Sequence, residues 1–328
     1  MLRSIRTQET RNRYSHVSPL SHLTRRCFLQ ASAAALGTAL LPAYSASAAQ
    51  AAAKISTIDL GRLKLLQGSG CNVIAMRGED GASGGALMID GGLRVNADAL
   101  IRSVKDATGN NRIHTLINTH WHPEQTGANE AVGRDGGVII AHENTKMFLG
   151  NTVSSVTFEG RRPPLPESAR PNKTTRTEGS LMFAGQKVDY SYLPAAHTDG
   201  DLYVHFPELN VLAVGGVISG EEWPVLDFLN GAWLGARVRA VERLADLVKP
   251  DTRVVPTDGR VITGSDVVRQ RDIYRELFQT MIAYMNKGFG PEDAARENPL
   301  KKYSAEFGDA SKFLYGAYRS MLIAYVPD

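Results

Sequence analysis

The feature that most constrains the fold is the alternation of short apolar segments with amphipathic segments along most of the chain. Such interleaving of strands and helices predicts an α/β protein built in layers. The predicted strands are 63–67, 71–77, 86–89, 113–118, 137–141, 181–183, 186–193, 202–206, 211–214 and 253–256. The predicted helices among them are 96–108, 129–132, 143–149 and 232–248.

The character of the sequence changes to helical after Thr263, with predicted helices at 265–287, 291–298 and 304–325. Apolar side chains recur on one side of the first of these helices. They are Val268, Ile273, Leu277, Met281, Ile282 and Met285. Such a stripe indicates a helix that covers a sheet or contacts an oligomer partner. We therefore expect a helical C-terminal extension over residues 265–328, following a sheet domain over 49–264.

The first 48 residues have the order of an export signal. Arg25 and Arg26 precede Phe28-Leu29 and an Ala-rich apolar run, and Ala46-Ser47-Ala48 follows as a cleavage-type end. This order is typical of secretory signals, and the arginine pair resembles the twin-arginine class. A membrane anchor is the alternative, but the apolar run is shorter than the roughly 18 residues that a spanning helix needs. The sequence predicts a periplasmic protein cleaved near Ala48.

The charge of the predicted mature chain argues against several classes of partner. Removing residues 1–48 removes six Arg and one Glu, which changes the net charge from +3 to −2. Without a basic run, the chain has no signature of nucleic-acid or anionic-membrane binding, and no later segment is apolar enough to span a membrane. Cys71 is then the single cysteine, so no internal disulfide forms, and we expect it to be a buried small residue.

Three histidines follow two predicted strands. His120 and His122 come after strand 113–118, and residues two apart in an extended chain point the same way. His197 follows strand 186–193 and supplies a third imidazole from another loop. Three histidines and a water molecule are typical of an open catalytic zinc site.

An ordered series of motifs around these histidines resembles the metallo-β-lactamase-fold hydrolase superfamily. Residues 87–91 are similar to its strand-and-Asp element, 119–127 to its His-x-His-x-Asp-His signature and 196–201 to its third-histidine loop. The resemblance continues through 210–217, 223–227 and 254–259 and covers about Ile58 to Thr263. It implies an αββα sandwich with one or two metals, usually zinc, at the loop edge of its sheets. There a bound hydroxide attacks an ester, amide, thioester or phosphodiester bond.

The chain departs from the superfamily pattern at the second metal position. Glu124 stands where the superfamily has Asp, Gln125 where it has His, Gly216 where it has a bridging Asp, and Asp258 where it has the last His. The first position keeps the matched ligands His120, His122 and His197. We therefore expect one zinc ion. If Glu124 and Asp258 supply oxygen ligands, Mn or Fe is the alternative to zinc. Either carboxylate could instead act as a general base.

Each candidate residue also has a purely structural interpretation. The histidines could belong to a degenerate descendant that kept the loop without a metal. Glu124 could be a carboxylate favoured at a helix N-terminus, and Asp258 a turn residue. We expect Asp199 and Asp201 to shape the loop that carries His197. The segment 160–179 is long enough to be a flap over the site or a disordered excursion.

Two functions follow from these motifs. The first is hydrolysis of a small-molecule ester or amide at a metal, with Glu124 or Asp258 assisting proton transfer. The second is a non-catalytic role as a ligand-binding or accessory factor of a periplasmic redox system, which the missing carboxylate at position 216 favours. Cleavage of β-lactams does not follow from the resemblance, because loops that no motif constrains set the shape of the pocket.

Overall fold

The computed structural model describes residues 54–80 and 84–325 of the chain, and these lie in one compact unit that spans residues 51–328. The predicted export signal lies outside the described residues and stays a prediction. Among the helices of the described ranges, none combines the length and the apolar character needed to cross a membrane.

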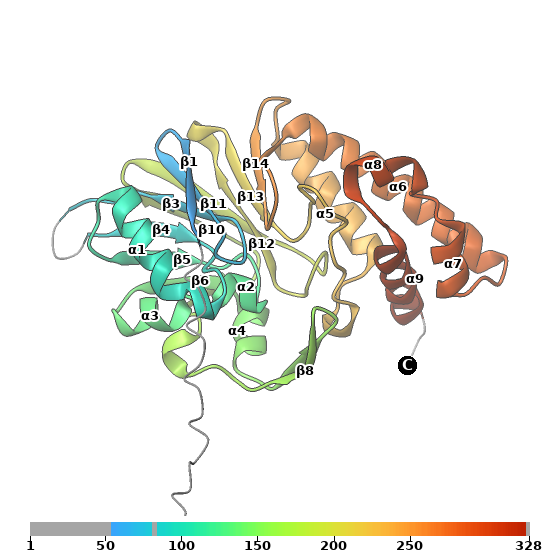
Figure 1. Cartoon of the computed structure of the whole chain (residues 1–328), viewed down its shortest axis with the longest axis horizontal. Coiled ribbons are helices and arrows are strands. Elements are labelled where there is room, and N and C mark those ends of the chain that lie inside the picture. Colours follow the sequence, from blue (N-terminus) through green and yellow to red (C-terminus); the bar gives the residue numbers. More distant parts are fainter. Residues whose placement is uncertain (1–53, 81–83, 326–328) are drawn as a thin grey trace, which may run out of the picture. The chain divides into compact units, whose positions relative to one another are not determined.

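Two mixed sheets form the centre of this unit (Figure 1). The first sheet has the order β1-β2-β3-β4-β5-β6-β9 and the second β10-β11-β12-β13-β14-β15, while β7 and β8 form a separate hairpin. The strands of the first sheet are β1 (Ser56–Leu60), β2 (Leu63–Gln67), β3 (Val73–Met76), β4 (Ala86–Ile89), β5 (Ile113–Ile117), β6 (Val138–His142) and β9 (Lys173–Thr175). The others are β7 (Val153–Ser155), β8 (Phe158–Arg162), β10 (Glu178–Phe183), β11 (Gln186–Leu193), β12 (Asp201–Phe206), β13 (Val211–Gly215), β14 (Arg253–Pro256) and β15 (Ile262–Thr263).

The buried apolar side chains form three clusters, one for each junction between layers. The first lies between the first sheet and its helices and includes Leu100 and Val132, and the second lies between the two sheets. The third joins the second sheet to helices α5 and α6. Three such junctions make the predicted four-layer αββα sandwich. The α-helices before the C-terminal region are α1 (Ala97–Thr108), α2 (Pro123–Thr126), α3 (Asn129–Arg134), α4 (Glu143–Leu149) and α5 (Leu234–Leu247).

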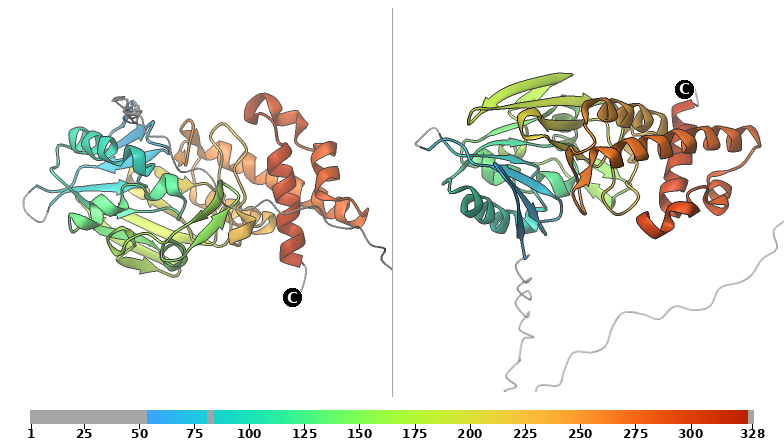
Figure 2. Two further views of the ribbon diagram at one scale, coloured as in Figure 1. Left: turned by 60° about the horizontal axis from the view of Figure 1, so that its bottom comes forward. Right: turned by 90° about the horizontal axis from the view of Figure 1, so that it is seen from above.

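Helices follow the second sheet, as expected, and lie together at one end of the unit (Figure 2). They are α6 (Gly264–Asn286), α7 (Pro291–Glu297), α8 (Ser304–Phe307) and α9 (Ser311–Tyr325). The buried face of α6 includes Ile273, Leu277 and Met281, but Val268 is 36% exposed and Val267 is buried in its place. The single helix predicted over 304–325 is wrong. Gly308 adopts a left-handed φ of +70° that ends α8, and α9 begins three residues later.

The segment 160–179 begins within β8, contains β9 and ends within β10. β9 pairs in parallel with β6 at the edge of the first sheet. Asn172 fixes this edge, because its Oδ1 accepts from the Ile139 amide and its Nδ2 donates to the Gly137 carbonyl. The β7–β8 hairpin instead reaches the loop edge of the sheets, where the Ser155 hydroxyl donates to the Asp227 carboxylate at 2.7 Å.

Candidate metal centre

Two loops at one edge of the sheets carry the three histidines. His120 and His122 lie between β5 and α2, and His197 lies between β11 and β12. The Asp90 carboxylate fixes the start of the first loop by accepting from the amide and hydroxyl of Thr119 at 2.7 and 2.8 Å. Burial raises the pKa of Asp90 to about 7.

The second loop is organised by Asp201, as predicted. Its carboxylate accepts from the backbone amides of His197 and Thr198 and from the Thr198 hydroxyl, at 2.6, 3.0 and 2.7 Å. Asp199 accepts a hydrogen bond from the Tyr192 hydroxyl. Both aspartates therefore hold the loop that presents His197.

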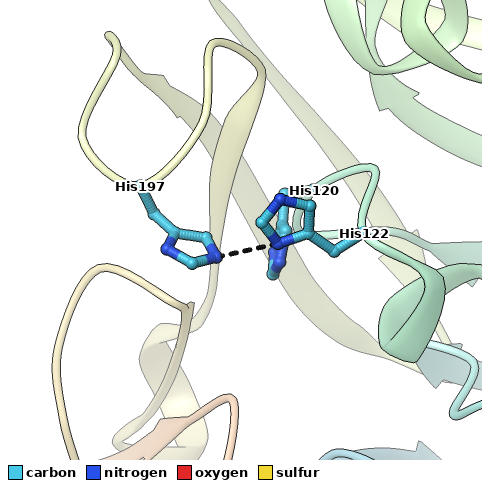
Figure 3. Close-up of side chains that lie close together, drawn as sticks. All are labelled: His120, His122 and His197. Carbon is cyan, nitrogen blue, oxygen red and sulfur yellow. Dashed lines mark hydrogen bonds between the residues drawn. The ribbon is translucent and has the colours of Figure 1, made fainter. Parts of the chain in front are cut away.

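The three imidazoles converge on one point (Figure 3). His120, His122 and His197 are buried, with exposed fractions of 1%, 0% and 5%, and each offers a nitrogen within 4.8 Å of the others. Within residues 54–80 and 84–325, no other group of three or more His, Cys, Asp or Glu side chains meets this criterion.

The outer nitrogen of each ring is held by an acceptor. Nδ1 of His197 contacts the Val225 carbonyl at 2.8 Å, and Nε2 of His122 contacts the Asp227 carboxylate at 3.1 Å. Nδ1 of His120 contacts Oγ1 of Thr119 at 3.1 Å, and that hydroxyl already donates to Asp90. Each outer nitrogen therefore carries the proton, because its partner can only accept. The three inner nitrogens are left with lone pairs.

These inner lone pairs indicate a metal site. Nδ1 of His122 and Nε2 of His197 lie 3.2 Å apart, and Nε2 of His120 is buried without a hydrogen-bond partner. Two ligands of a tetrahedral zinc, each about 2.0–2.1 Å from the ion, lie roughly 3.3 Å apart. Burial, followed by the neighbouring imidazoles, holds the pKa of His120 well below its ordinary value, and the pKa of His197 is lowered in the same way. Neutral imidazoles that face one another in this way suit a cation.

Of the two predicted catalytic carboxylates, Glu124 lies next to the cluster. Oε1 of Glu124 is 3.8 Å from Nδ1 of His122, and the side chain is 31% exposed. Glu124 also lies in the first turn of the short helix α2, so the geometry fits both of its interpretations. Asp258 follows β14 in an exposed turn. Partial burial and the carboxylates Glu222, Glu221 and Glu124 raise the pKa of Asp258.

The second metal position of the superfamily pattern is filled by other contacts. Nε2 of Gln125 donates to Oγ1 of Thr257. A Cβ on Gly216 would lie 2.4 Å from Cδ2 and 2.5 Å from Nε2 of His197. The imidazole therefore occupies the space that a side chain at position 216 would need.

Two residues that support the cluster were not predicted. Asp227 is fully buried against His122, and the fully buried Arg237 donates from Nε to the Ala196 carbonyl at 3.0 Å and from Nη2 to the Val225 carbonyl at 2.6 Å. The available signal was an Asp within an apolar segment and an Arg among the apolar positions of a predicted helix.

The other histidines of the two sheets and Trp121 take no part in the cluster of three imidazoles. His114, His142 and His205 lie outside the cluster, and Nδ1 of His142 accepts from the Asn144 amide at the start of α4. Trp121 is buried and packs edge-on against His122, with ring centroids 4.7 Å apart. Cys71 is a free, buried thiol, as predicted.

Comparison with known proteins agrees with this geometry. Residues 66–276 match the sequence family described as the Metallo-beta-lactamase superfamily. The chain belongs to this superfamily. It is therefore a protein of the metallo-β-lactamase hydrolase fold, and its buried histidines indicate a metal site.

Similar proteins include chains that match over nearly their whole length and longer ones that match over about half of it. A linear primary-alkylsulfatase from a Pseudomonas species is 22% identical in an alignment of 276 positions that covers 72% of this chain and 52% of the relative. The chain thus spans about half the length of that curated relative. A solved metallo-beta-lactamase from Pontibacter korlensis has a TM-score of 0.53 at 19% identity, covering 68% of this chain and 99% of that one. The stereoselective inverting sec-alkylsulfatase Pisa1 from Pseudomonas sp. has a TM-score of 0.62 at 14% identity, covering 83% and 50%.

Proposed function

We propose that this superfamily member is an exported hydrolase that uses one zinc ion, held by His120, His122 and His197, to cleave an ester- or amide-type bond in a small molecule. The observation that carries the proposal is the set of three buried imidazoles whose inner nitrogens all present lone pairs. A zinc ion held by three histidines keeps an open position and lowers the pKa of a bound water molecule to about 7.

The surrounding residues keep the site ready for the ion. The hydrogen bonds that the imidazoles donate to Asp227, the Val225 carbonyl and Thr119 fix the tautomer and the orientation of each ring. Since the metal ligands must be unprotonated, the lowered pKa of His120 and of His197 favours binding at neutral pH.

We assign proton transfer to Glu124. Its carboxylate lies 3.8 Å from an inner nitrogen of the cluster and is partly exposed, so it can take a proton at the site and exchange it with solvent. Asp258 is the second carboxylate of this edge, and its raised pKa would let it hold a proton closer to neutral pH than an ordinary Asp.

The contacts at Gly216 and Gln125 support one metal ion rather than two. No carboxylate is available at position 216, and the Gln125 amide is engaged with Thr257. The signal-type sequence around Arg25 and Arg26 supports export to the periplasm. Cell fractionation of the Arg25→Lys/Arg26→Lys variant tests export, because we expect the variant to stay in the cytoplasm.

The experiment that tests the site is elemental analysis of the purified protein beside the His120→Ala/His197→Ala variant, followed by a panel of ester and amide substrates. We expect about one zinc per chain in the parent and none in the variant. Glu124→Gln should keep the zinc and lose turnover by a factor of about 10²–10⁴. If the parent binds no transition metal, the protein is a non-catalytic member of the superfamily and the proposal is wrong.

A further inference from the structure

The loop that contains Val225 and Asp227 supports the histidines with one face. Its other face lines a cavity of about 1220 Å³. One face of the loop presents the Val225 carbonyl to His197 and the Asp227 carboxylate to His122. The other face closes the cavity against α7 and α9, which contact each other. The cavity and the candidate metal centre therefore share one wall.

Aromatic rings make up much of the cavity lining. Trp223 stacks on Phe313 with ring centroids 5.4 Å apart and planes 5° from parallel, and Phe307 tilts against Trp223 at 4.7 Å. Phe228 and Tyr315 line the cavity as well. Phe307 and Phe313 are buried, whereas Trp223, Phe228 and Tyr315 are partly exposed. Aromatic faces attract organic cations, most strongly where the cation has lost part of its hydration shell. The partly exposed rings thus suit a cation with an apolar body.

The charge of the lining favours the same ligand. Four exposed carboxylates line the cavity, against one cation, Lys312. Among the described residues, none of the four forms an ion pair. These carboxylates belong to Glu221, Glu222, Glu292 and Asp309.

Further contacts define this charge balance. The Asp309 carboxylate accepts from the amide and hydroxyl of Ser311 at the start of α9. The Arg319 guanidinium lies 5.9 Å from the ring centroids of Phe228 and Tyr315, and the Arg237 guanidinium lies 6.0 Å from that of Phe313. When both are counted with Lys312, three positive groups face four negative ones. A recess lined mainly by one sign of charge concentrates ligands of the opposite sign.

The negative charge continues from the cavity toward the histidines. Glu221 lies against the turn that carries Asp258, because a Cβ on Gly259 would be only 2.9 Å from Cγ of Glu221. Val156 and Val225 line the cavity and are 38% and 43% exposed, which is unusual for large apolar side chains beside a buried site. The amide of Val156 also contacts the Asp227 carboxylate at 3.4 Å.

We propose that this cavity binds an organic cation with an apolar body, such as an alkylammonium compound, as a site next to the candidate metal centre. A long-chain sulfate, the class named for the curated relative, would place its negative charge among the carboxylates of the cavity. We therefore expect this protein to discriminate against such anions.

Isothermal titration calorimetry with two ligands of equal chain length tests the proposal. The ligands are octyltrimethylammonium and octyl sulfate, each kept below its micelle concentration. The protein is the His120→Ala/His197→Ala variant, so binding is measured without metal or turnover. At low ionic strength we expect the cation to bind at least tenfold more tightly than the sulfate, and added salt to reduce the difference.

Charge-neutral variants locate the binding site. We expect Glu222→Gln/Glu292→Gln to weaken octyltrimethylammonium binding at least fivefold, while Glu178→Gln, at an exposed position on β10, leaves it unchanged. Octyl sulfate that binds as tightly as the cation, or more tightly, would overturn the inference. Unchanged cation binding in Glu222→Gln/Glu292→Gln would also overturn it. Cation binding without zinc or turnover in the parent protein would instead overturn the proposed function alone.

Discussion

Arg237 and His197 share one acceptor, the carbonyl oxygen of Val225. Nη2 of Arg237 donates to it at 2.6 Å, and Nδ1 of His197 donates to it at 2.8 Å. Nε of Arg237 also donates to the Ala196 carbonyl, so the guanidinium braces the chain on both sides of the imidazole. Helix α5, which carries Arg237, thereby fixes a side chain of the candidate metal centre.

Removing this brace should destabilise the fold. In Arg237→Met, the buried Ala196 carbonyl loses its donor, and the Val225 carbonyl keeps only His197. A buried group left without a partner costs about 1–3 kcal/mol, so we expect the free energy of unfolding to fall by roughly 2–4 kcal/mol. Urea unfolding of the metal-free protein measures this. Arg239→Met, at an exposed position of the same helix, is the matched control and should change stability by less than about 1 kcal/mol.

Asp227→Asn should weaken metal binding while preserving the fold. The amide keeps the size of the carboxylate, and the Ser155 hydroxyl and the Asn230 amide, which donate to the same oxygen as Nε2 of His122, favour the amide oxygen at that place. The variant therefore loses the negative charge that raises the basicity of the inner nitrogen of His122, and mutation of such an outer partner typically reduces metal affinity 10–100-fold. A zinc titration against a chromophoric chelator gives the value. The exposed Asp246→Asn is the control, and an Asp227→Asn affinity equal to that of the control would contradict the assigned role.

The zinc affinity should resist mild acid. Two imidazoles with the ordinary pKa of 6.5 would lose roughly 16-fold in affinity between pH 8 and pH 6, because protons compete for the ligand nitrogens. Burial holds the pKa of His120 and of His197 well below that value, so protons should compete less for these two ligands, and the zinc affinity should fall by less than 16-fold over this range.

Chelator competition at pH 8, 7 and 6 checks this expectation. The comparison is a peptide of residues 118–123, whose two imidazoles are exposed to solvent. The zinc affinity of the peptide should fall roughly 16-fold between pH 8 and pH 6, and that of the protein should fall by less. A decrease in the protein's affinity of more than about 16-fold would contradict the prediction.

The close approach of Gly216 to His197 should make position 216 intolerant of any side chain. A Cβ at 2.4 Å forces the ring to move, so we expect Gly216→Ala to lower zinc affinity at least tenfold and stability by about 1–3 kcal/mol. For the same reason, Gly216→Asp combined with Gln125→His and Asp258→His should gain no second metal ion. Gly316→Ala in α9 is the control, because its Cβ would lie no closer than 3.8 Å to Phe228, and helical Gly→Ala changes are neutral or stabilising by up to about 1 kcal/mol.

The fold was predictable wherever apolar periodicity was strong. The bounds predicted for β2, β4, β11, β14 and α4 agree with the structure. The edge strands β1 and β9 carry mostly exposed residues, so no apolar pattern distinguishes them from loops. The face of α6 was misassigned at Val268 because Val267 and Val268 are adjacent and only packing decides which one is buried.

The three histidines of the candidate site were predictable because local motifs mark each of the two loops that carry them. The spacing of His120 and His122 and the position of His197 identified the cluster that the structure brings together. Asp227 and Arg237 were missed because their roles depend on contacts with residues 105 and 41 positions away, which no local pattern records. The domain boundaries, the export signal and the catalytic role of Glu124 stay predictions.

The loop with one face toward the histidines and the other toward the cavity lies between the two proposed binding sites. A ligand that shifted the loop on one side would also move Val225 or Asp227 on the other. By thermodynamic reciprocity, the factor by which a bound cation then changed the zinc affinity would equal the factor by which zinc changed the cation affinity. With a factor above one, the supply of metal would set how strongly the protein retains the cation.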